Sequence, residues 1–190
     1  MIAGQLPRSL EVNDTLYPIR SDFREILQIL VAYDDPELED KEKAYVCLYI
    51  LYPDFDDMPE EDYEAAYKQA CWFIQGGGDT EGESNRRPIK TVDWQQDERL
   101  LFAAVNRVAG KEIRAEAYLH WWTFLGYFSE ITEGPYAEVL RLRVKKGTGK
   151  PLEKWEQTFW SENQGICKIR PRLTEEEKAI RDKINALLDS

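Results

Sequence analysis

Apolar and polar residues alternate between Ser9 and Ile19, on both sides of the pair Asn13-Asp14. Such alternation is typical of a strand with one buried face, and an Asn-Asp pair tolerates the positive φ angles of a tight turn. The pattern therefore predicts a β-hairpin in this segment. Because Pro18 has no N–H group, its strand is expected to be an edge strand or to end there.

After the hairpin, apolar residues recur at the three- and four-residue spacing of α-helices. Polar caps, prolines and glycines mark where the helices begin and end. Three helices are expected in the front of the chain: one begins at the capping box Asp22–Glu25, one runs from Asp35-Pro36 to just before Pro53, and one runs from near Pro59 to glycines 76–78.

Five further helices are expected in the rear of the chain, so that the predicted fold is mainly α, with seven or eight helices and a small N-terminal β-hairpin. The most apolar of them runs from about Arg114 to Ile131 and contains His120. The other four are a helix capped by Asp93 and closed by Gly110, a basic helix from Tyr136 to Lys146-Gly147, a short helix opened by Pro151, and a terminal helix with the capping box Thr174–Glu177.

The segment between the two groups of helices contains almost no apolar residue from Gly76 to Lys90. Such a segment cannot bury enough surface to offset the entropy of ordering it. We therefore predict a flexible linker over 76–92, between an acidic N-terminal region over 1–75 and a C-terminal helical region over 93–190. The periodicity leaves open whether the two regions share one core.

The composition is that of a folded, acidic protein. A hydrophobic content of 43% excludes a wholly disordered chain, despite 32% charged residues. The net charge of −11 argues against non-specific binding of the whole surface to DNA or to anionic membranes. The charge is uneven: residues 1–85 carry 6 basic and 20 acidic side chains, whereas 86–190 carry 19 and 16. The two regions are thus expected to attract each other, within one fold or between copies.

The sequence predicts a soluble protein of the cytoplasm. It has no apolar run of the ~18 residues needed to span a bilayer, and its first residues do not resemble a signal peptide. Cys47, Cys71 and Cys167 are widely spaced and odd in number, which favours reduced thiols over a disulfide framework or a zinc site.

Motifs for cofactor or metal binding are incomplete, so neither is expected. In the glycine-containing loop Gly77–Ser84, Glu83 stands where a phosphate-binding loop needs Lys. A calcium loop beginning at Asp54 would place Ala65 at the twelfth position, where the motif needs Glu. His120 is the sole histidine, and the sequence suggests no nucleophile or acid beside it. We expect a histidine that packs among aromatic rings and bonds a backbone carbonyl, in a protein that is not an enzyme.

Basic and aromatic residues are interleaved over 139–172, which holds nine basic and three acidic side chains. Single-stranded nucleic-acid sites combine cations with stacking rings in this way. However, Trp155 and Phe159 are four residues apart, as on the core-facing side of a helix. A solvated basic face or a protein-docking surface is the favoured interpretation, and nucleic-acid binding is the alternative.

Several segments carry a resemblance to a known family. They are Leu10-Glu11-Val12-Asn13, Tyr17-Pro18-Ile19, Ser21-Asp22-Phe23-Arg24, Glu42-Lys43, Phe73-Ile74, Asp93-Trp94 with Asp97, Phe102-Ala103-Ala104, Tyr118-Leu119-His120-Trp121-Trp122-Thr123-Phe124, Ile131 and Arg143. In this order they resemble the bacteriophage gene-product-fifteen family of tailed phages and prophages, over about residues 9–146. The most specific signature is His120, Trp121, Trp122 and Phe124, which we interpret as structural core.

The resemblance implies a binding protein of phage tail morphogenesis that acts in the cytoplasm of the bacterial host. Genes of this family tend to lie between those of the major tail protein and the tape-measure protein, where tail assembly chaperones are encoded. The implied partners are the tape-measure or tail-tube protein, with a homo-oligomer as a further possibility. The alternative is a minor structural protein of the tail.

A chaperone of this kind is expected to present apolar side chains on a helix face or groove to a helical client. The candidate partner-binding residues are Tyr45, Tyr49, Tyr52 and Trp72 in the front region and Ile180, Ile184 and Leu187 on the terminal helix. The competing interpretation is that these side chains pack in the core, as amphipathic stripes often do.

Overall fold

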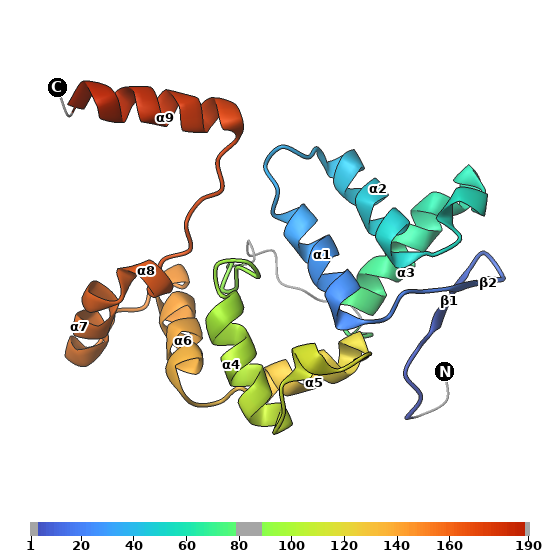
Figure 1. Ribbon diagram of the computed structural model, residues 1–190, viewed down its shortest axis with the longest axis horizontal. Coiled ribbons are helices and arrows are strands. Elements are labelled where there is room, and N and C mark those ends of the chain that lie inside the picture. The colour runs from blue at the N-terminus through green and yellow to red at the C-terminus, as the bar shows by residue number, and fades with distance from the viewer. Residues whose placement is uncertain (1–3, 79–88, 189–190) are drawn as a thin grey trace.

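The chain folds into a mainly α-helical protein with an N-terminal β-hairpin, as the apolar pattern predicts (Figure 1). The computed structural model describes residues 4–78 and 89–188. Within these ranges there are nine α-helices, where the sequence predicts seven or eight, and three short 3-10 helices. The central part of the predicted linker, 79–88, lies outside the described residues.

The helices and strands have the following bounds. The strands are β1 (Ser9–Val12) and β2 (Thr15–Pro18). The α-helices are α1 (Phe23–Tyr33), α2 (Asp40–Leu51), α3 (Tyr63–Ile74), α4 (Glu98–Ala109), α5 (Trp121–Ser129), α6 (Pro135–Gly147), α7 (Lys154–Glu162), α8 (Gln164–Cys167) and α9 (Glu175–Leu188). The 3-10 helices are η1 (Phe55–Asp57), η2 (Glu60–Asp62) and η3 (Ile113–Ala115).

The hairpin has the predicted turn, buries Leu10 and Val12 in the core, and is also bonded to a carboxylate of η2. Asn13 and Asp14 have φ angles of 46° and 64°, and the second strand ends at Pro18. The side chains of Asn13 and Tyr17 each donate a hydrogen bond of 2.7 Å to Asp62, in η2. These bonds, that of Tyr17 above all, lower the pKa of Asp62, so the carboxylate stays charged and the hairpin stays docked.

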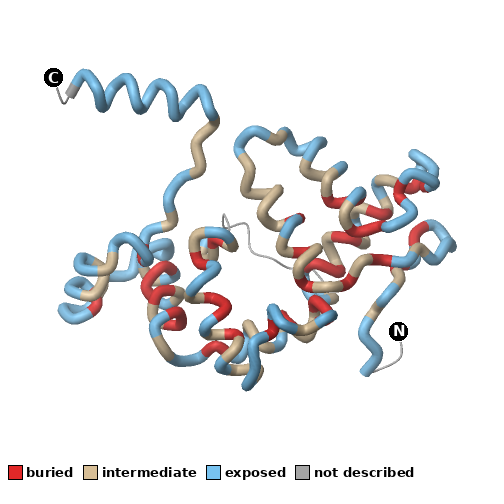
Figure 2. Tube along the Cα trace, viewed as in Figure 1, coloured by how far each residue is buried: buried red, intermediate tan, exposed pale blue. Residues whose placement is uncertain are grey.

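A continuous apolar core joins elements from both sides of residues 79–88 (Figure 2). At its centre the ring of Phe124 in α5 stacks on Phe23 in α1, with 5.1 Å between centroids, and on Trp121, at 5.3 Å. All three side chains are at most 1% exposed. A smaller cluster beside it contains Val139, Leu142 and Cys167.

Helix α2 begins later than predicted, at Asp40 and not at Pro36. Glu39 and Glu42 form a capping box in which each side chain accepts a hydrogen bond from the other end of the first turn. Asp35 instead accepts a hydrogen bond from the N–H of Glu37, which closes a local turn. The predicted start was wrong because two acidic capping signals stand close together, and the second forms the reciprocal pair.

Helix α4 also begins later than predicted, at Glu98. The carboxylate of Asp93 accepts hydrogen bonds from the N–H groups of Gln95 and Gln96, so that it caps a turn rather than the helix. The N–H of Asp93 in turn donates to the carboxylate of Asp97. Asp93 and Asp97 are both buried, and their other partners come from distant parts of the chain.

Helix α5 begins at Trp121, seven residues after the predicted start at Arg114, and His120 is its N-cap rather than an interior residue. The residues before it are held in an extended form by Ser21-Asp22. Phe23 N–H donates to Leu119 O at 3.0 Å, and Trp121 N–H donates to Ser21 O at 2.8 Å. These bonds use backbone groups that a continuous helix would need, so the helix begins after them.

Removing the central ring should destabilise the whole fold. We expect Phe124→Ala to lower the free energy of unfolding by about 3–5 kcal/mol, because it removes a buried aromatic side chain and leaves a cavity. Urea denaturation followed by tryptophan fluorescence would measure this loss. Leu16→Ala is the control, since Leu16 is 66% exposed and its truncation should change stability by less than about 0.5 kcal/mol. Equal losses in the two variants would contradict the assigned core.

Candidate partner-binding surfaces

Helix α9 extends away from the body of the molecule, and its residues 175–187 are exposed (Figures 1 and 2). At its first residue the N–H of Glu175 donates a hydrogen bond of 2.6 Å to the carboxylate of Glu37, in the connection between α1 and α2. The predicted capping box at its start is present: Glu177 N–H donates to Thr174 Oγ1, and Thr174 N–H donates to the Glu177 carboxylate. Ile180 and Ile184 are 58% and 50% exposed, and Leu187 is exposed as well. Across the described ranges, no helix has the length and apolar content needed to cross a bilayer.

The segment that leads into α9 is attached to the start of α4 by side-chain hydrogen bonds. Gln96 holds it at two points, since its amide nitrogen donates to Lys168 O at 2.7 Å and its amide oxygen accepts from Arg170 N–H at 3.0 Å. Arg172 forms an ion pair of 3.0 Å with Asp93. The base of α9 is thereby fixed to the body, although the helix itself is exposed.

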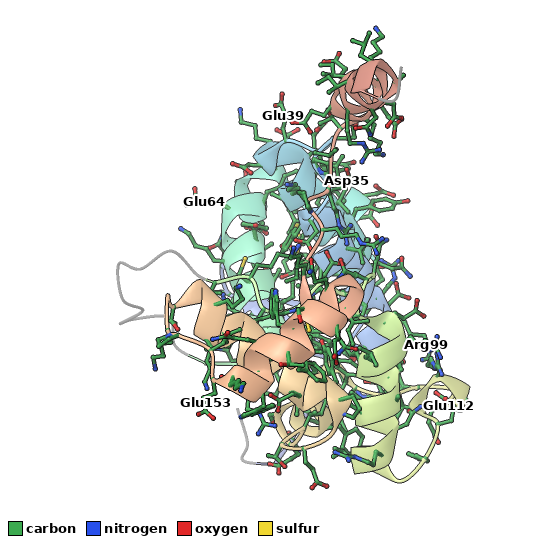
Figure 3. The ribbon with its side chains drawn as sticks, turned by 90° about the vertical axis from the view of Figure 1, so that its left-hand side faces the viewer. Asp35, Glu39, Glu64, Arg99, Glu112 and Glu153 are labelled. Carbon is green, nitrogen blue, oxygen red and sulfur yellow. The ribbon has the colours of Figure 1, made fainter. Side chains whose placement is uncertain are left out.

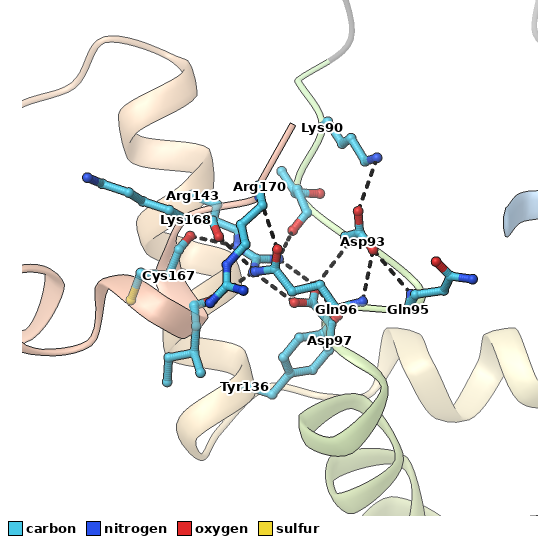
Figure 4. A network of polar contacts seen from close by, with 12 residues as sticks. Lys90, Asp93, Gln95, Gln96, Asp97, Tyr136, Arg143, Cys167, Lys168 and Arg170 are labelled. Carbon is cyan, nitrogen blue, oxygen red and sulfur yellow. Dashed lines mark hydrogen bonds and ion pairs between the residues drawn. The ribbon is translucent and has the colours of Figure 1, made fainter. Parts of the chain in front are cut away.

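A buried ion pair lies beneath this attachment (Figure 4). The guanidinium of Arg143 in α6 contacts both carboxylate oxygens of Asp97, at 2.5 Å and 2.8 Å, and both side chains are at most 3% exposed. Tyr136 adds a hydrogen bond to Asp97 at 3.3 Å. The remaining donors of Arg143 reach three backbone carbonyls, those of Thr91, Ile166 and Cys167. The pair therefore holds residues 91, 97, 143 and 166–167 together.

A second exposed apolar surface lies on α2. The rings of Tyr45 and Tyr49 stack with 6.4 Å between centroids, and both meet the edge of the buried Phe55. Tyr45 is 54% exposed and Tyr49 is 56% exposed. Acidic side chains also lie in this part of the chain; Glu39, at the start of α2, and Glu64, in α3, point outward in Figure 3.

Two of the predicted partner-binding residues do not lie on this surface. Tyr52 is 1% exposed and donates a hydrogen bond from Oη to Ala66 O, so it belongs to the core and its prediction as a partner-binding residue was wrong. Trp72 is half-buried and packs edge-to-face on Trp122, with 5.5 Å between centroids. Tyr49 and Tyr52 are the same residue type, three positions apart, and the sequence pattern does not tell them apart. Tyr49 lies on the exposed side of α2, whereas Tyr52, the C-cap residue of α2, points into the core.

His120 has both ring nitrogens engaged with the backbone. Nδ1 accepts from the N–H of Trp122 at 3.0 Å, and Nε2 donates to the carbonyl of Pro7 at 2.9 Å. The ring packs edge-on against Phe73 and Trp122. Burial is the main cause that lowers the pKa of His120, and Arg8 lowers it further. Among the residues that the structure describes, no three His, Cys, Asp or Glu side chains converge on a possible metal position.

Ion pairs occupy much of the basic segment over 139–172. Four of its nine basic side chains pair with carboxylates: Arg141 with Glu138, Arg143 with Asp97, Lys145 with Glu156 and Arg172 with Asp93. Phe159 and Trp160 pack against the small core cluster. Trp155, which is 54% exposed, is thus the most accessible of these three rings.

Two surface hollows were not predicted from the sequence. A groove of about 540 Å³ lies between α1 and α4 and is lined by Leu27, Val31 and Trp94, among others. A cleft of about 720 Å³ lies between α6 and α7, with Val144 and Trp155 in its lining. The apolar residues that line the two hollows lie on the same helix stripes as core residues. The sequence pattern therefore does not distinguish these lining residues from buried ones.

Comparison with known proteins gives one match. The sequence model of a family described as Bacteriophage Gp15 protein matches residues 2–164, which is most of the chain. Neither the curated proteins nor the solved structures that were compared contain a match to the chain.

The buried ion pair makes a clear prediction for stability. Arg143→Met leaves the carboxylate of Asp97 buried without its cation, and we expect a loss of about 3–5 kcal/mol in the free energy of unfolding, measured by urea denaturation. Arg141→Met is the matched control on the same helix. Arg141 is 61% exposed, and the loss of its pair with Glu138 should cost less than about 1 kcal/mol. Similar losses in the two variants would show that the buried pair is not a main support of the fold.

The buried histidine predicts a pH dependence. Since the pKa of His120 is lower in the folded protein than its usual value of 6.5, the unfolded chain binds the proton more readily. The free energy of unfolding should therefore fall as the pH drops from about 7.5 to about 5.5. In His120→Asn, which retains a side chain that can cap α5, this part of the pH dependence should disappear. An identical pH profile in both proteins would contradict the assignment.

Proposed function

The chain belongs to the bacteriophage Gp15 protein family, and from that membership we propose that it is a tail assembly chaperone without enzymatic activity. In this proposal it acts in the cytoplasm of the bacterial host and binds the tape-measure or tail-tube protein before assembly. Family membership supports a phage protein. The features that favour binding over chemistry are the exposed apolar side chains and the engagement of both His120 nitrogens with the backbone.

Helix α9 is the observation that carries the proposal. Isolated helices of about 12–15 residues are only marginally stable in water, and most helices gain their stability from packing an apolar face. Ile180 and Ile184 lie four residues apart on one face of α9 and are at least half exposed. A client helix or groove that covered this face would supply the missing packing, as in other helix-in-groove complexes.

The charge arrangement favours a protein client over nucleic acid. Arg141, Arg143, Lys145 and Arg172 already pair with carboxylates, so fewer cations are left to track a phosphate backbone. The surface around α2 carries many carboxylates, which would repel such a ligand. These contacts support a protein-docking interpretation of the basic segment.

Co-expression with each candidate client tests the proposal. We expect the wild-type chain to raise the soluble fraction of the tape-measure or tail-tube protein, and to be recovered in a complex with it. Ile180→Ser/Ile184→Ser should weaken the complex by about 10- to 100-fold, because part of the ~1.5–3 kcal/mol from burying each isoleucine is lost. Purified chain and client, titrated by calorimetry, would measure the affinity.

The matched control is Ala179→Ser/Ala186→Ser, which introduces the same residue type on α9 about a third of a turn away from the isoleucine face. It should bind like the wild type, although Ala→Ser lowers helix propensity more than Ile→Ser does. Unchanged solubility of both clients, or equal binding by the two double variants, would contradict the proposal. Mass spectrometry of purified particles addresses the alternative, because a minor structural protein would remain in the finished tail and a chaperone would not.

A further inference from the structure

The groove between α1 and α4 exposes apolar side chains. Its volume is about 540 Å³, and Leu27, Val31, Trp94 and Phe102 belong to its lining. Leu27, Val31 and Trp94 are only half-buried, so their surfaces are available to a partner. Leu27 and Val31 lie four residues apart on one side of α1, where they form a short apolar ridge along the groove.

The two arginines that line the groove already have ion-pair partners. Arg24 pairs with Asp22 at 2.9 Å, and Arg114 pairs with Glu112 at 2.8 Å. Glu98 is the other charged residue described in the lining. Charge therefore gives little selection of an occupant, and the fit of apolar side chains decides what binds.

One end of the groove lies against the polar side of α9 from the same copy. A hollow of about 390 Å³ shares Val31 with the groove and is also lined by Lys178 and Arg181 of α9. These two residues are centred about 110° around the helix from Ile180 and Ile184. Neither isoleucine lines the hollow or the groove. The apolar side of α9 is therefore turned away from the groove of its own copy.

The base of α9 is held in this orientation by polar contacts. The N–H of Glu175 donates to the carboxylate of Glu37 at 2.6 Å, and Arg172 pairs with Asp93 at 3.0 Å. To enter the groove of its own copy, α9 would have to break the first of these contacts and turn its isoleucines inward. Because α9 extends away from the body (Figure 1), it can enter the groove of a second copy with its base unchanged.

The apolar side of α9 has the same spacing as the ridge of the groove. Ile180 and Ile184 lie four residues apart, about 6 Å along the helix, as do Leu27 and Val31. Both isoleucines are at least half exposed. A helix of this length is only marginally stable without packing, and an apolar groove is a common way to supply it.

We propose that two copies of the chain exchange α9, so that the isoleucines of each copy pack into the groove between α1 and α4 of the other. The same contact is then made twice about a two-fold axis, and the assembly closes at a dimer. No conformational change of the body is needed, because the helix and the groove already have the required exposure.

The size of the exchanged contact favours a second copy as the occupant. Each copy contributes the ten described residues that line its groove and up to 13 exposed residues of α9, over 175–187. Stable dimers of standard size use about 20–30 residues a side. One helix in one groove would supply only about half of this number, whereas the reciprocal exchange reaches it.

The exchange goes beyond the proposed function and does not rest on it. The contact forms between copies of this chain alone, and a client that binds the same isoleucines would compete with the second copy. Sedimentation of the chain alone reports on the exchange, whereas calorimetry with the client reports on client binding. Either can therefore fail while the other succeeds.

Sedimentation velocity of the purified full chain tests the association. We expect an equilibrium between monomer and dimer that does not proceed to larger species. The dimer should persist when NaCl is raised from about 0.1 M to about 1 M, although the electrostatic screening length falls from about 10 Å to about 3 Å, because the contact is apolar. A chain that stays monomeric at its highest soluble concentration, or one that grows beyond a dimer, would overturn the proposal.

Two variants, each lacking one side of the contact, give a sharper test. Ile180→Ser/Ile184→Ser removes the side chains that α9 inserts, and Leu27→Ser removes part of the ridge that receives them. Each variant alone should dimerise about 10- to 100-fold more weakly than the wild type. An equimolar mixture should dimerise more strongly than either variant, because α9 of the second variant still fits the groove of the first. A mixture no stronger than its components would overturn the proposal.

Leu30→Ser is the matched control for the groove variant. Leu30 is a half-buried leucine on the same helix that packs against the core and does not line the groove. It should lose a similar amount of stability and still dimerise like the wild type, and an equal loss of dimer in both leucine variants would overturn the proposal. If Leu27→Ser fails to fold, the isoleucine variant decides, since its exposed positions should leave the circular dichroism and unfolding midpoint unchanged. Its dimerising like the wild type would overturn the proposal.

Discussion

The buried pair between Arg143 and Asp97 is the interaction on which the arrangement of the rear half depends. Two charges removed from water are tolerated only where geometry and hydrogen bonding are complete. Here the carboxylate receives both ends of the guanidinium together with Tyr136 and the N–H of Asp93. The guanidinium also donates hydrogen bonds to the carbonyl of Thr91, which precedes α4, and to those of Ile166 and Cys167, at the end of α8. Because each charge has the other as its ion-pair partner among the described residues, the pair holds α4, α6 and α8 in one relative position.

The attachment of α9 is a consequence of that arrangement. The same turn that supplies Asp97 also supplies Asp93 and Gln96, which bind the segment leading into the terminal helix. A firmly attached base and an uncovered apolar face are two separate properties of this helix. The first comes from a buried polar network, and the second comes from the fact that the described side chains of α9, over 175–187, are not part of the core.

Function, in this view, depends on which surfaces the fold leaves uncovered. The core takes most of the aromatic residues, including the Trp121 and Phe124 of the family signature, whereas Tyr45, Tyr49, Trp155 and the α9 isoleucines remain outside it. The same fold separates the acidic front of the chain from its basic rear in space.

The local sequence determined those parts of the fold whose stabilising groups are close together in the chain. The Asn13-Asp14 turn, the left-handed Gly110 that ends α4 and the capping box of α9 were predicted because each is complete within a few residues. The mainly α class and the hairpin followed from periodicity, which is also local. The family signature around His120 was recognised as core for the same reason, since its rings are dense within a short segment.

Tertiary structure decided what depends on partners distant in the chain. The start of α5 was mispredicted because Ser21 and Asp22, about a hundred residues earlier, bind the backbone before Trp121. From the sequence, Asp93 was predicted to cap a helix and Arg143 to belong to a basic segment. In the fold both are buried in ion pairs, Asp93 with Arg172 and Arg143 with Asp97, and these pairs form only when α4, α6 and α8 pack together. Tyr52 was placed on the surface although it is buried, because an apolar stripe is equally consistent with a core and with a docking face. Only the packed fold determines which face is covered, since burial is a property of neighbours that the local sequence does not contain.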